Sequence, residues 1–296
     1  MRILLTGGTG LIGQALIKRW HLQHDVTVLT RDIGKAATLL ANVRLVHSLD
    51  EVDFNSIDAV VNLAGEPIAE KRWTTIQKDR ICQSRWLLTE DLAGRILQAR
   101  TPPHLLINGS AVGFYGRQDH GPLDEHYSGF YPEFSHDVCA RWENLANRAK
   151  TDKTRVAIVR IGIVLASSGG ALAKMLPAFK LGLGGPISHG AQYMSWIHLD
   201  DLVALFDHLL HQSDAEGIYH GTAPMAVTNQ QFTKLLAERL HRPAWFRVPA
   251  FVLKLALGEM SDLLIYGQQV YPQRVLDSGF RYQYPQLRQA LDALDL

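Results

Sequence analysis

Three glycines near the N-terminus have the spacing of a loop that binds phosphate groups. Gly7, Gly10 and Gly13 fall in the run GGTGLIG. A strand-like apolar run precedes them, and a helical pattern opens at Leu11 and Ile12. Glycine permits a sharp turn and lets a pyrophosphate approach the free N–H groups at a helix N-terminus. We therefore expect these residues to hold the pyrophosphate of a dinucleotide; a glycine turn that only packs is the alternative.

The end of the second strand-like run indicates which dinucleotide is bound. Chains that bind NAD usually place a carboxylate there for the ribose 2′-hydroxyl, whereas VLTRD places Thr30 and Arg31. An arginine can pair with a 2′-phosphate through charge-assisted hydrogen bonds. We therefore expect NADP(H), held at this end by Thr30 and Arg31. Two alternatives stay open: Asp32 turning inward to a ribose, and Arg31 as a solvated loop residue.

The elements that must position these residues alternate between β-rich and helical patterns. Strand-like runs occur at 2–7, 26–31, 43–48, 58–65, 104–111 and 155–165. A long helix is expected from about Thr75 to Ala99. This alternation predicts an α/β fold, a doubly wound Rossmann-type parallel sheet with helices on both faces. The carboxyl ends of parallel strands meet along one edge of the sheet, where ligands bind.

The pattern divides the chain into two regions. Residues 1–165 are expected to form an NADP-binding Rossmann domain, and residues 166–296 a mixed region. Within the latter, SWIHLDDLVALFDHLL returns a strand and a helix to the sheet, and a capping box at Thr228 and Gln231 opens another helix. The apolar and aromatic segment from Phe246 onward is expected to form a smaller C-terminal substrate lobe.

Composition excludes several classes of partner. With 47% hydrophobic and 20% charged residues, the 296-residue chain can bury a sizeable core. A formal net charge of +1 offers no electrostatic footprint for nucleic acid or an anionic membrane. The N-terminus enters a strand at once, which leaves no room for a signal peptide. Two cysteines, Cys82 and Cys139, are too few for a disulfide framework or a zinc site, so a reducing cytoplasm is expected.

Several further motifs carry a resemblance to a known family. They are TGGTGLIG, NLAG (62–65), GSAVGFYG (109–116), RIGIVL (160–165) and SWIHLDDL (195–202). With them the chain resembles the extended short-chain dehydrogenase/reductase superfamily, the NAD-dependent epimerase/dehydratase group that includes nucleotide-sugar epimerases. The runs NLAGEPIAEKRW and GGALAKMLPAFKLGLGGPI, the pair Ser84-Arg85 and the ending QQVYPQRVLDSGFRYQYPQLRQAL are similar to its atypical branch of "epimerase family proteins", short-chain dehydrogenase family 39U. The resemblance covers almost the whole chain, and it implies that helices near 75–99 and 135–150 can pair in a homodimer.

The resemblance also implies a mechanism that this chain does not fully match. A serine after the fifth strand polarises the substrate oxygen in the superfamily, and Ser110 matches it. A downstream Tyr-x-x-x-Lys pair supplies the general acid/base, and its lysine lowers the tyrosine pKa and holds the nicotinamide ribose. Alignment on Glu143, which matches a glutamate common four residues after that lysine, places Ser135 at the tyrosine and Cys139 at the lysine. Serine is a far poorer base and neutral cysteine supplies no cation, so the usual hydride chemistry is not simply carried over.

Other residues are candidates for the missing acid/base. Glu66 follows NLAG at the expected carboxyl end of the fourth strand, where it can act as acid/base or orient the cofactor amide; a loop cap is the alternative. Tyr115, close after Ser110, can bring a phenol toward the nicotinamide, as can Tyr127 or Tyr131 in the loop before the next helix. A core or lid aromatic is the alternative for each tyrosine.

The same sheet edge supplies the remaining expected cofactor contacts. These are Leu63, Ala64, Gly65, Ile163 and Val164. Arg85 on the long helix is expected to reach the cofactor phosphates, with an exposed helix arginine as the alternative. Cys139 is expected to be small, buried and inert rather than a nucleophile.

Two functional hypotheses follow. In the first, the chain is an NADP-dependent oxidoreductase or epimerase-like enzyme with a rebuilt acid/base, and the GLGGPI loop and C-terminal lobe close over a small polar substrate. In the second, it is a non-catalytic NADP(H)-binding sensor or regulatory protein. Retention of Ser110 beside the cofactor motif favours the first, and loss of both members of the proton-transfer pair favours the second. The chain carries no motif with a readable substrate preference.

Overall fold

A twisted parallel sheet forms the centre of the protein. The computed structural model describes all 296 residues and contains a seven-stranded sheet in the order β10-β6-β5-β4-β1-β2-β3, in which every neighbouring pair is parallel. Its strands are β1 (Arg2–Thr6), β2 (Asp25–Leu29), β3 (Arg44–Val46), β4 (Ala59–Asn62), β5 (Leu105–Ala111), β6 (Arg155–Ile161) and β10 (Gly217–Gly221). The order reverses between β1 and β4, so the crevice at that point is the place where a doubly wound sheet binds its ligand. The expected doubly wound α/β fold is confirmed.

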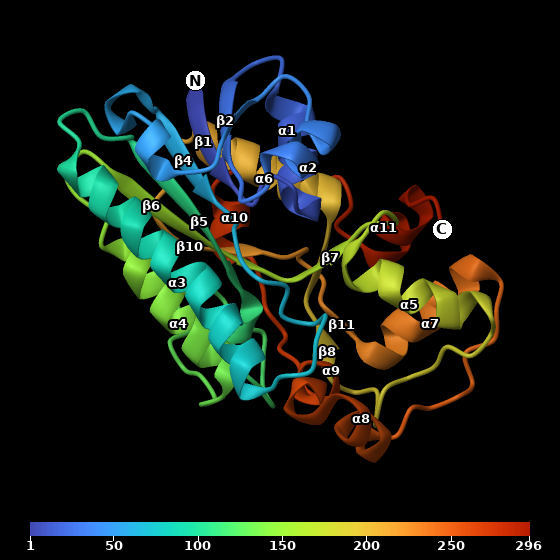
Figure 1. Cartoon of the computed structure of the whole chain (residues 1–296). Helices are drawn as coiled ribbons and strands as arrows, with labels where there is room; N and C mark the ends of the chain where they lie inside the picture. The colour runs from blue at the N-terminus through green and yellow to red at the C-terminus, as the bar shows by residue number, and fades with distance from the viewer.

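Helices cover both faces of this sheet. One face packs on α1, α2 and α6 around a core that includes Leu5, Trp20 and Phe206, and the other packs on α3 and α4 around Leu4 and Leu92. Figure 1 shows α3 and α4 lying side by side on that second face. The helices are α1 (Leu11–Trp20), α2 (Ile33–Leu39), α3 (Thr75–Gln98), α4 (Phe134–Asn147), α5 (Gly170–Lys180), α6 (Leu199–His211), α7 (Asn229–Leu240), α8 (Ala250–Leu257), α9 (Asp262–Ile265), α10 (Gln273–Asp277) and α11 (Leu287–Ala293). No helix has both the length and the apolar character that a bilayer crossing requires.

The run 155–165 differs from its prediction as one strand. It divides at Gly162 into β6 and β7 (Ile163–Leu165), and β7 leaves the main sheet to pair with β9 (Trp196–His198). A Cβ on Gly162 would lie 2.4 Å from the Ser195 carbonyl oxygen, so only glycine fits where the chain changes sheets. The split carries Ile163 and Val164 out over the carboxyl edge of the main sheet.

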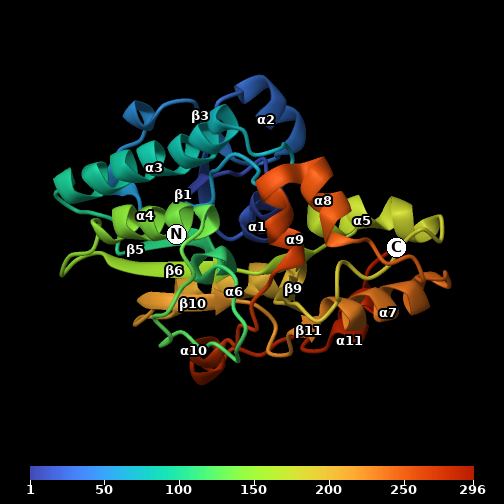
Figure 2. The ribbon, with the colours of Figure 1, turned by 90° about the horizontal axis from the view of Figure 1, so that it is seen from below.

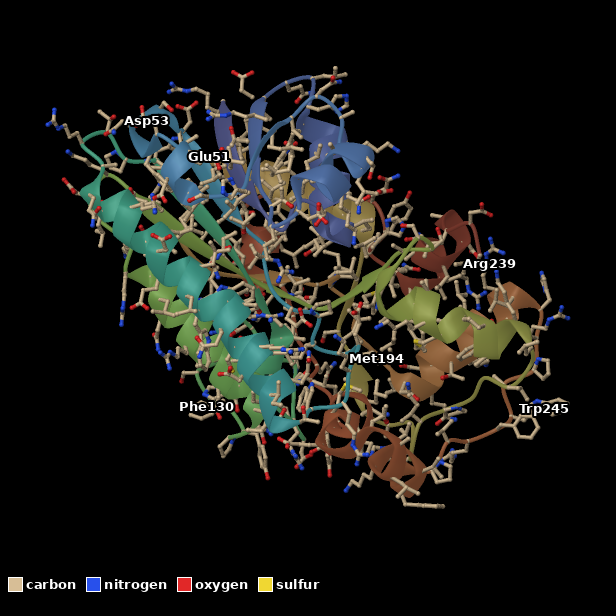
Figure 3. All side chains as sticks on the ribbon, in the orientation of Figure 1. Glu51, Asp53, Phe130, Met194, Arg239 and Trp245 are labelled. Atoms are coloured by element: carbon tan, nitrogen blue, oxygen red, sulfur yellow. The ribbon has the colours of Figure 1, made fainter.

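The second half of the chain builds a smaller core beside the sheet. Helices α5, α7 and α11 enclose Phe179, Trp196 and Phe232, and the predicted capping box at Thr228 and Gln231 opens α7. Two short strands, β8 (Tyr193–Met194) and β11 (Val227–Thr228), pair at its edge. Met194 packs against this core and lies between it and the sheet half, whereas Trp245, 85% exposed, projects from the far edge (Figure 3).

The last helices are distributed over both halves of the protein. Helix α10 lies against β10 and α11 packs on α7 (Figure 2). Helix α8 has no buried residue. Short 3-10 turns complete the structure: η1 (Leu49–Glu51), η2 (Phe54–Ser56), η3 (Val112–Tyr115) and η4 (Gly258–Ser261). Glu259 of η4 pairs with Lys78 of α3, so this segment also reaches across to the sheet half.

Candidate functional site

The glycine turn between β1 and α1 is shaped by close backbone contacts. Gly7 has a φ of 73°, and a Cβ there would lie 2.7 Å from the Leu63 carbonyl group. A Cβ on Gly13 would lie 2.3 Å from the Gly7 oxygen. Gly10 is the N-cap of α1 and supplies no capping side chain, which leaves the N–H groups of the first turn, from Leu11 on, without a side-chain acceptor. These contacts produce a bare helix N-terminus that suits a pyrophosphate.

The end of β2 offers a cation without a competing carboxylate. Arg31 is exposed, and it takes part in no ion pair. Asp32 does not turn inward, because its side chain caps α2 by accepting a 2.9 Å hydrogen bond from the Lys35 N–H. Thr30 Oγ1 is held by the main chain of Asp32. This arrangement fits a 2′-phosphate better than a free ribose hydroxyl.

The loop after β4 is pinned beside the glycine turn. Thr6 Oγ1 accepts hydrogen bonds from the N–H groups of Leu63 and Ala64 at 3.2 and 3.1 Å, and donates to Asn62 at 2.6 Å. Leu63 and Ala64 therefore pass directly over Gly7. The loop continues through Gly65 and Glu66 toward α3.

Glu66 is a partly exposed carboxylate at this carboxyl edge. Its N–H donates to Ser84 Oγ at 2.8 Å, which fixes the backbone. Its Oε1 accepts only a long bond, 3.4 Å, from Gln77 Nε2. The carboxylate therefore keeps most of its hydrogen-bonding capacity for other partners.

Arg85 lies beneath the same loop rather than on the outer surface of α3. Its Nη1 donates to the main-chain oxygens of Glu66 and Ile81, both at 3.0 Å. The guanidinium stacks at 5.2 Å from the Trp142 ring of α4. Burial lowers the pKa of Arg85, partly opposed by Cys139, Cys82 and Glu66 around it.

Ser110 is tied into a buried ion pair. Its Oγ donates to Glu143 Oε1 at 2.6 Å, and Arg160 donates to both oxygens of Glu143 at 2.9 and 2.8 Å. The side chains of Arg160 and Glu143 are only 3% and 7% exposed. Since a serine has one hydroxyl proton, Ser110 has none left to polarise a carbonyl.

Tyr115 extends the same network away from the sheet edge. Arg160 Nη1 donates to the Tyr115 hydroxyl at 2.8 Å, and that hydroxyl lies 2.7 Å from His220 Nε2. His220 Nδ1 lies 2.8 Å from the Tyr271 carbonyl oxygen, which can only accept, so Nδ1 carries the proton and Nε2 accepts from Tyr115. Burial raises the pKa of Tyr115 to about 12. The Tyr115 phenol is thus fully buried, in agreement with the alternative of a core aromatic.

Arg160 and His220 belong to this buried network, and the sequence motifs did not single them out. A readable signal did exist, because Arg160 interrupts the otherwise apolar run VAIVRIGIVL. A charge in a buried strand requires a counter-ion. In the structure that counter-ion is Glu143. His220 carries no such signal, since its partner Tyr115 is distant in sequence.

Most of the chain matches the profile of a known family. The profile described as "NAD dependent epimerase/dehydratase family" matches residues 3–220. The chain belongs to this family. A further profile, a domain of unknown function named DUF1731, matches residues 248–294.

Relatives within the epimerase family align over nearly the full chain. The epimerase family protein SDR39U1 homolog, chloroplastic, of Arabidopsis thaliana is 38% identical over 99% of this chain and 86% of its own length. Human SDR39U1 is 36% identical over 98% of each chain. The crystal structure of human SDR39U1 isoform 2 with NADPH superposes with a TM-score of 0.91 at 35% identity, covering 99% of this chain and 98% of that one. The resemblance to the 39U branch is confirmed.

More distant epimerases share the fold alone. UDP-glucuronic acid 4-epimerase from Bacillus cereus, solved with UDP-glucuronic acid and NAD, has a TM-score of 0.78 at 14% identity and covers 99% of this chain and 97% of that one. At such identity the likeness extends to the order of the strands and not to the site.

Ser135 and Cys139, which align with the usual tyrosine and lysine, are both buried. Ser135 Oγ donates to Glu133 Oε1 at 2.7 Å and is buried. Burial raises the pKa of the Cys139 thiol to about 11, with the negative charge of Glu143 adding to the shift, so Cys139 stays neutral. Neither side chain can supply the proton transfer of the missing pair.

The aromatic residues in the loop before α4 also contact neighbouring side chains. The Tyr127 hydroxyl lies 2.9 Å from His120, and the Tyr131 ring lies 4.4 Å from the Arg117 guanidinium. Phe130 stacks on His136 of α4 at 3.7 Å, which folds the loop back onto the helix (Figure 3). Glu66 and Arg85 are therefore the partly open polar side chains among the predicted residues near the β4 edge.

The expected cofactor contacts Ile163 and Val164 lie in the strand that leads to α5. They form β7, and both are half-buried. Residues 166–169 connect β7 to α5, and Cβ atoms on Gly169 or Gly170 would lie 3.3 Å from the Leu11 side chain. The β7–α5 connection and the glycine turn thus lie side by side.

Proposed function

We propose that the chain is an NADP(H)-dependent oxidoreductase or epimerase-like enzyme whose acid/base differs from the usual pair. The observation that carries this proposal is the combination of an uncapped α1 N-terminus with an exposed Arg31 whose neighbour Asp32 is consumed as a helix cap. The human relative solved with NADPH supports the choice of nucleotide. The bound cofactor would donate a hydride as NADPH or accept one as NADP⁺.

Proton transfer is assigned to Glu66 in this proposal. It lies at the carboxyl end of β4 next to the switch point, and its carboxylate makes only one long hydrogen bond. Ser110 keeps Glu143 and Arg160 in place and does not touch the substrate. Region 166–296 supplies the β7–α5 connection and the second core, and we assign the substrate-binding lobe to it.

A non-catalytic NADP(H) sensor is the second candidate. It is favoured by the sequestration of Ser110, Tyr115 and Cys139, each of which is buried and two of which are hydrogen-bonded to protein groups. In a sensor, nucleotide binding at the edge between the two halves would order the second half without chemistry.

Three assays distinguish the two candidates: oxidation of NADPH by a panel of aldehydes and ketones, reduction of NADP⁺ by a panel of alcohols, and epimerisation of nucleotide sugars in the presence of the cofactor. An enzyme that uses Glu66 loses roughly 100-fold or more in kcat in Glu66→Gln. Its NADPH affinity stays unchanged, and Glu70→Gln, in the exposed part of the same loop, behaves like the wild type. NADPH binding without turnover anywhere in the panel, with slower amide exchange in α5 and α7, identifies the sensor. Turnover that survives Glu66→Gln contradicts the role given to Glu66.

A further inference from the structure

Arg85 presents a guanidinium whose hydrogen-bond donors are only partly used. Nη1 makes both of its hydrogen bonds, to main-chain oxygens. Nε and Nη2 have no acceptor in the chain, and no carboxylate forms an ion pair with Arg85. Arg85 is partly exposed, and neither nitrogen is among the unpartnered side-chain atoms that are sealed from solvent. A partly buried cation with open donors is a binding group for ligand oxygens.

The guanidinium faces the loop at the carboxyl end of β4. A Cβ built on Gly65 would lie 2.7 Å from Arg85 Cζ, 2.9 Å from Nη2 and 3.0 Å from Nε. The open donors thus lie against Gly65, an exposed residue of the site. The guanidinium carbon also lies 5.2 Å from the centroid of the Trp142 ring, which is a cation–π contact.

The order of the strands indicates which half of a bound dinucleotide would lie near Arg85. Strand β2, which carries Arg31, lies on one side of β1, and β4 and β5 lie on the other. A nucleotide with its 2′-phosphate at Arg31 and its pyrophosphate at α1 extends its nicotinamide half over β4 and β5. Arg85 lies under the β4 loop and near Cys139, the position that corresponds to the missing lysine.

We propose that Arg85 binds the nicotinamide half of NADP(H), with Nε and Nη2 donating hydrogen bonds to ribose oxygens. This inference rests on the proposed NADP(H) binding, and it replaces the expectation that Arg85 reaches the phosphates. The cation of the site comes from α3 instead of α4. Since the nicotinamide ring of NADP⁺ is positively charged and that of NADPH is neutral, a cation at this place also favours the reduced form.

Two ligands separate this role from a general effect on the fold. NADPH carries both halves of the cofactor, whereas adenosine 2′,5′-bisphosphate carries the adenine half and lacks the nicotinamide ribose. Arg85→Met is expected to weaken NADPH about 10-fold, and NADP⁺ less, while the bisphosphate binds within about twofold of wild type. Arg141→Met is the matched control, because Arg141 stacks on Trp86 of α3 on the exposed side of α4. It is expected to change none of the three affinities.

Gly65→Ala tests the same contact without removing the arginine. The added Cβ would displace the flexible end of Arg85. We expect the same selective loss of NADPH affinity, and little further loss when it is combined with Arg85→Met. Unchanged NADPH affinity in Arg85→Met, or equal weakening of NADPH and the bisphosphate, overturns the assignment. If the wild type binds neither ligand, the proposed function itself fails.

Discussion

The Ser110 hydroxyl donates its only proton to Glu143 at 2.6 Å. In this family the corresponding serine is expected to polarise a substrate oxygen. Here it holds a buried carboxylate that also accepts two bonds from Arg160. The polar residues across β5, β6 and β10 therefore form one internal network, from Ser110 through Tyr115 to His220.

Ser110→Ala is expected to lower stability and leave nucleotide binding intact. Loss of a hydrogen bond to a buried carboxylate costs about 1–3 kcal/mol. Urea unfolding measures the stability, and titration with NADPH measures the binding. A loss of NADPH affinity with unchanged stability would place Ser110 at the ligand instead.

The pair Arg160–Glu143 is expected to be strongly coupled. Arg160→Met leaves a buried carboxylate without its counter-ion and is expected to cost about 3–5 kcal/mol of unfolding free energy. The double variant with Glu143→Gln is expected to lose clearly less than the sum of the single losses. The matched control is the exposed pair Arg148–Glu90, whose side chains are 60% and 54% exposed. Removal of that pair is expected to cost at most about 1 kcal/mol. Additive losses at Arg160 and Glu143 would show that they do not act as a pair.

His220 is expected to make the protein less stable as the pH falls. Burial lowers its pKa from 6.5 to about 4 in the folded chain. Between these values the unfolded chain binds more protons, so stability rises with pH and is lost on acidification from pH 6.5 toward 4. The full contribution is about 3 kcal/mol.

The His220→Gln variant isolates this effect. Its unfolding free energy, compared with the wild type between pH 7 and pH 4.5, should fall less on acidification. The other groups that face His220, namely Tyr115, Glu125, Arg160 and Tyr271, are present in both proteins. Parallel curves for the two proteins would mean that the pKa of His220 is the same in the folded and unfolded chains, which contradicts this prediction.

Much of the fold was predictable because its periodic elements are locally encoded. The apolar runs at β1, β4 and β5 and the glycine turn before α1 all lie where the pattern places them. The departure at 155–165 depends on Gly162 meeting the Ser195 backbone, a contact between distant segments. Periodicity carries no information about such an approach.

The candidate site was predictable in part for the same reason. Arg31 and Asp32 are adjacent in sequence, so the sequence alone named both as candidates to bind the adenine-side ribose or its 2′-phosphate. Only the structure shows that Asp32 is used as a helix cap. The contact of Tyr115 with His220 could not be predicted from the sequence, because those residues lie 105 positions apart. The position of Arg85 beneath Gly65 could not be predicted either, because it depends on how α3 crosses the loop after β4.

The most direct test of the central claim is a calorimetric titration with NADPH and NADH, using wild type and Arg31→Asp. The wild type should bind NADPH more tightly than NADH. Arg31→Asp should weaken NADPH by about 1–3 kcal/mol, for the loss of a charge-assisted contact, and affect NADH little. Absence of binding to both nucleotides, or equal affinity for both in the wild type with no change in Arg31→Asp, would contradict an NADP(H) site at this edge.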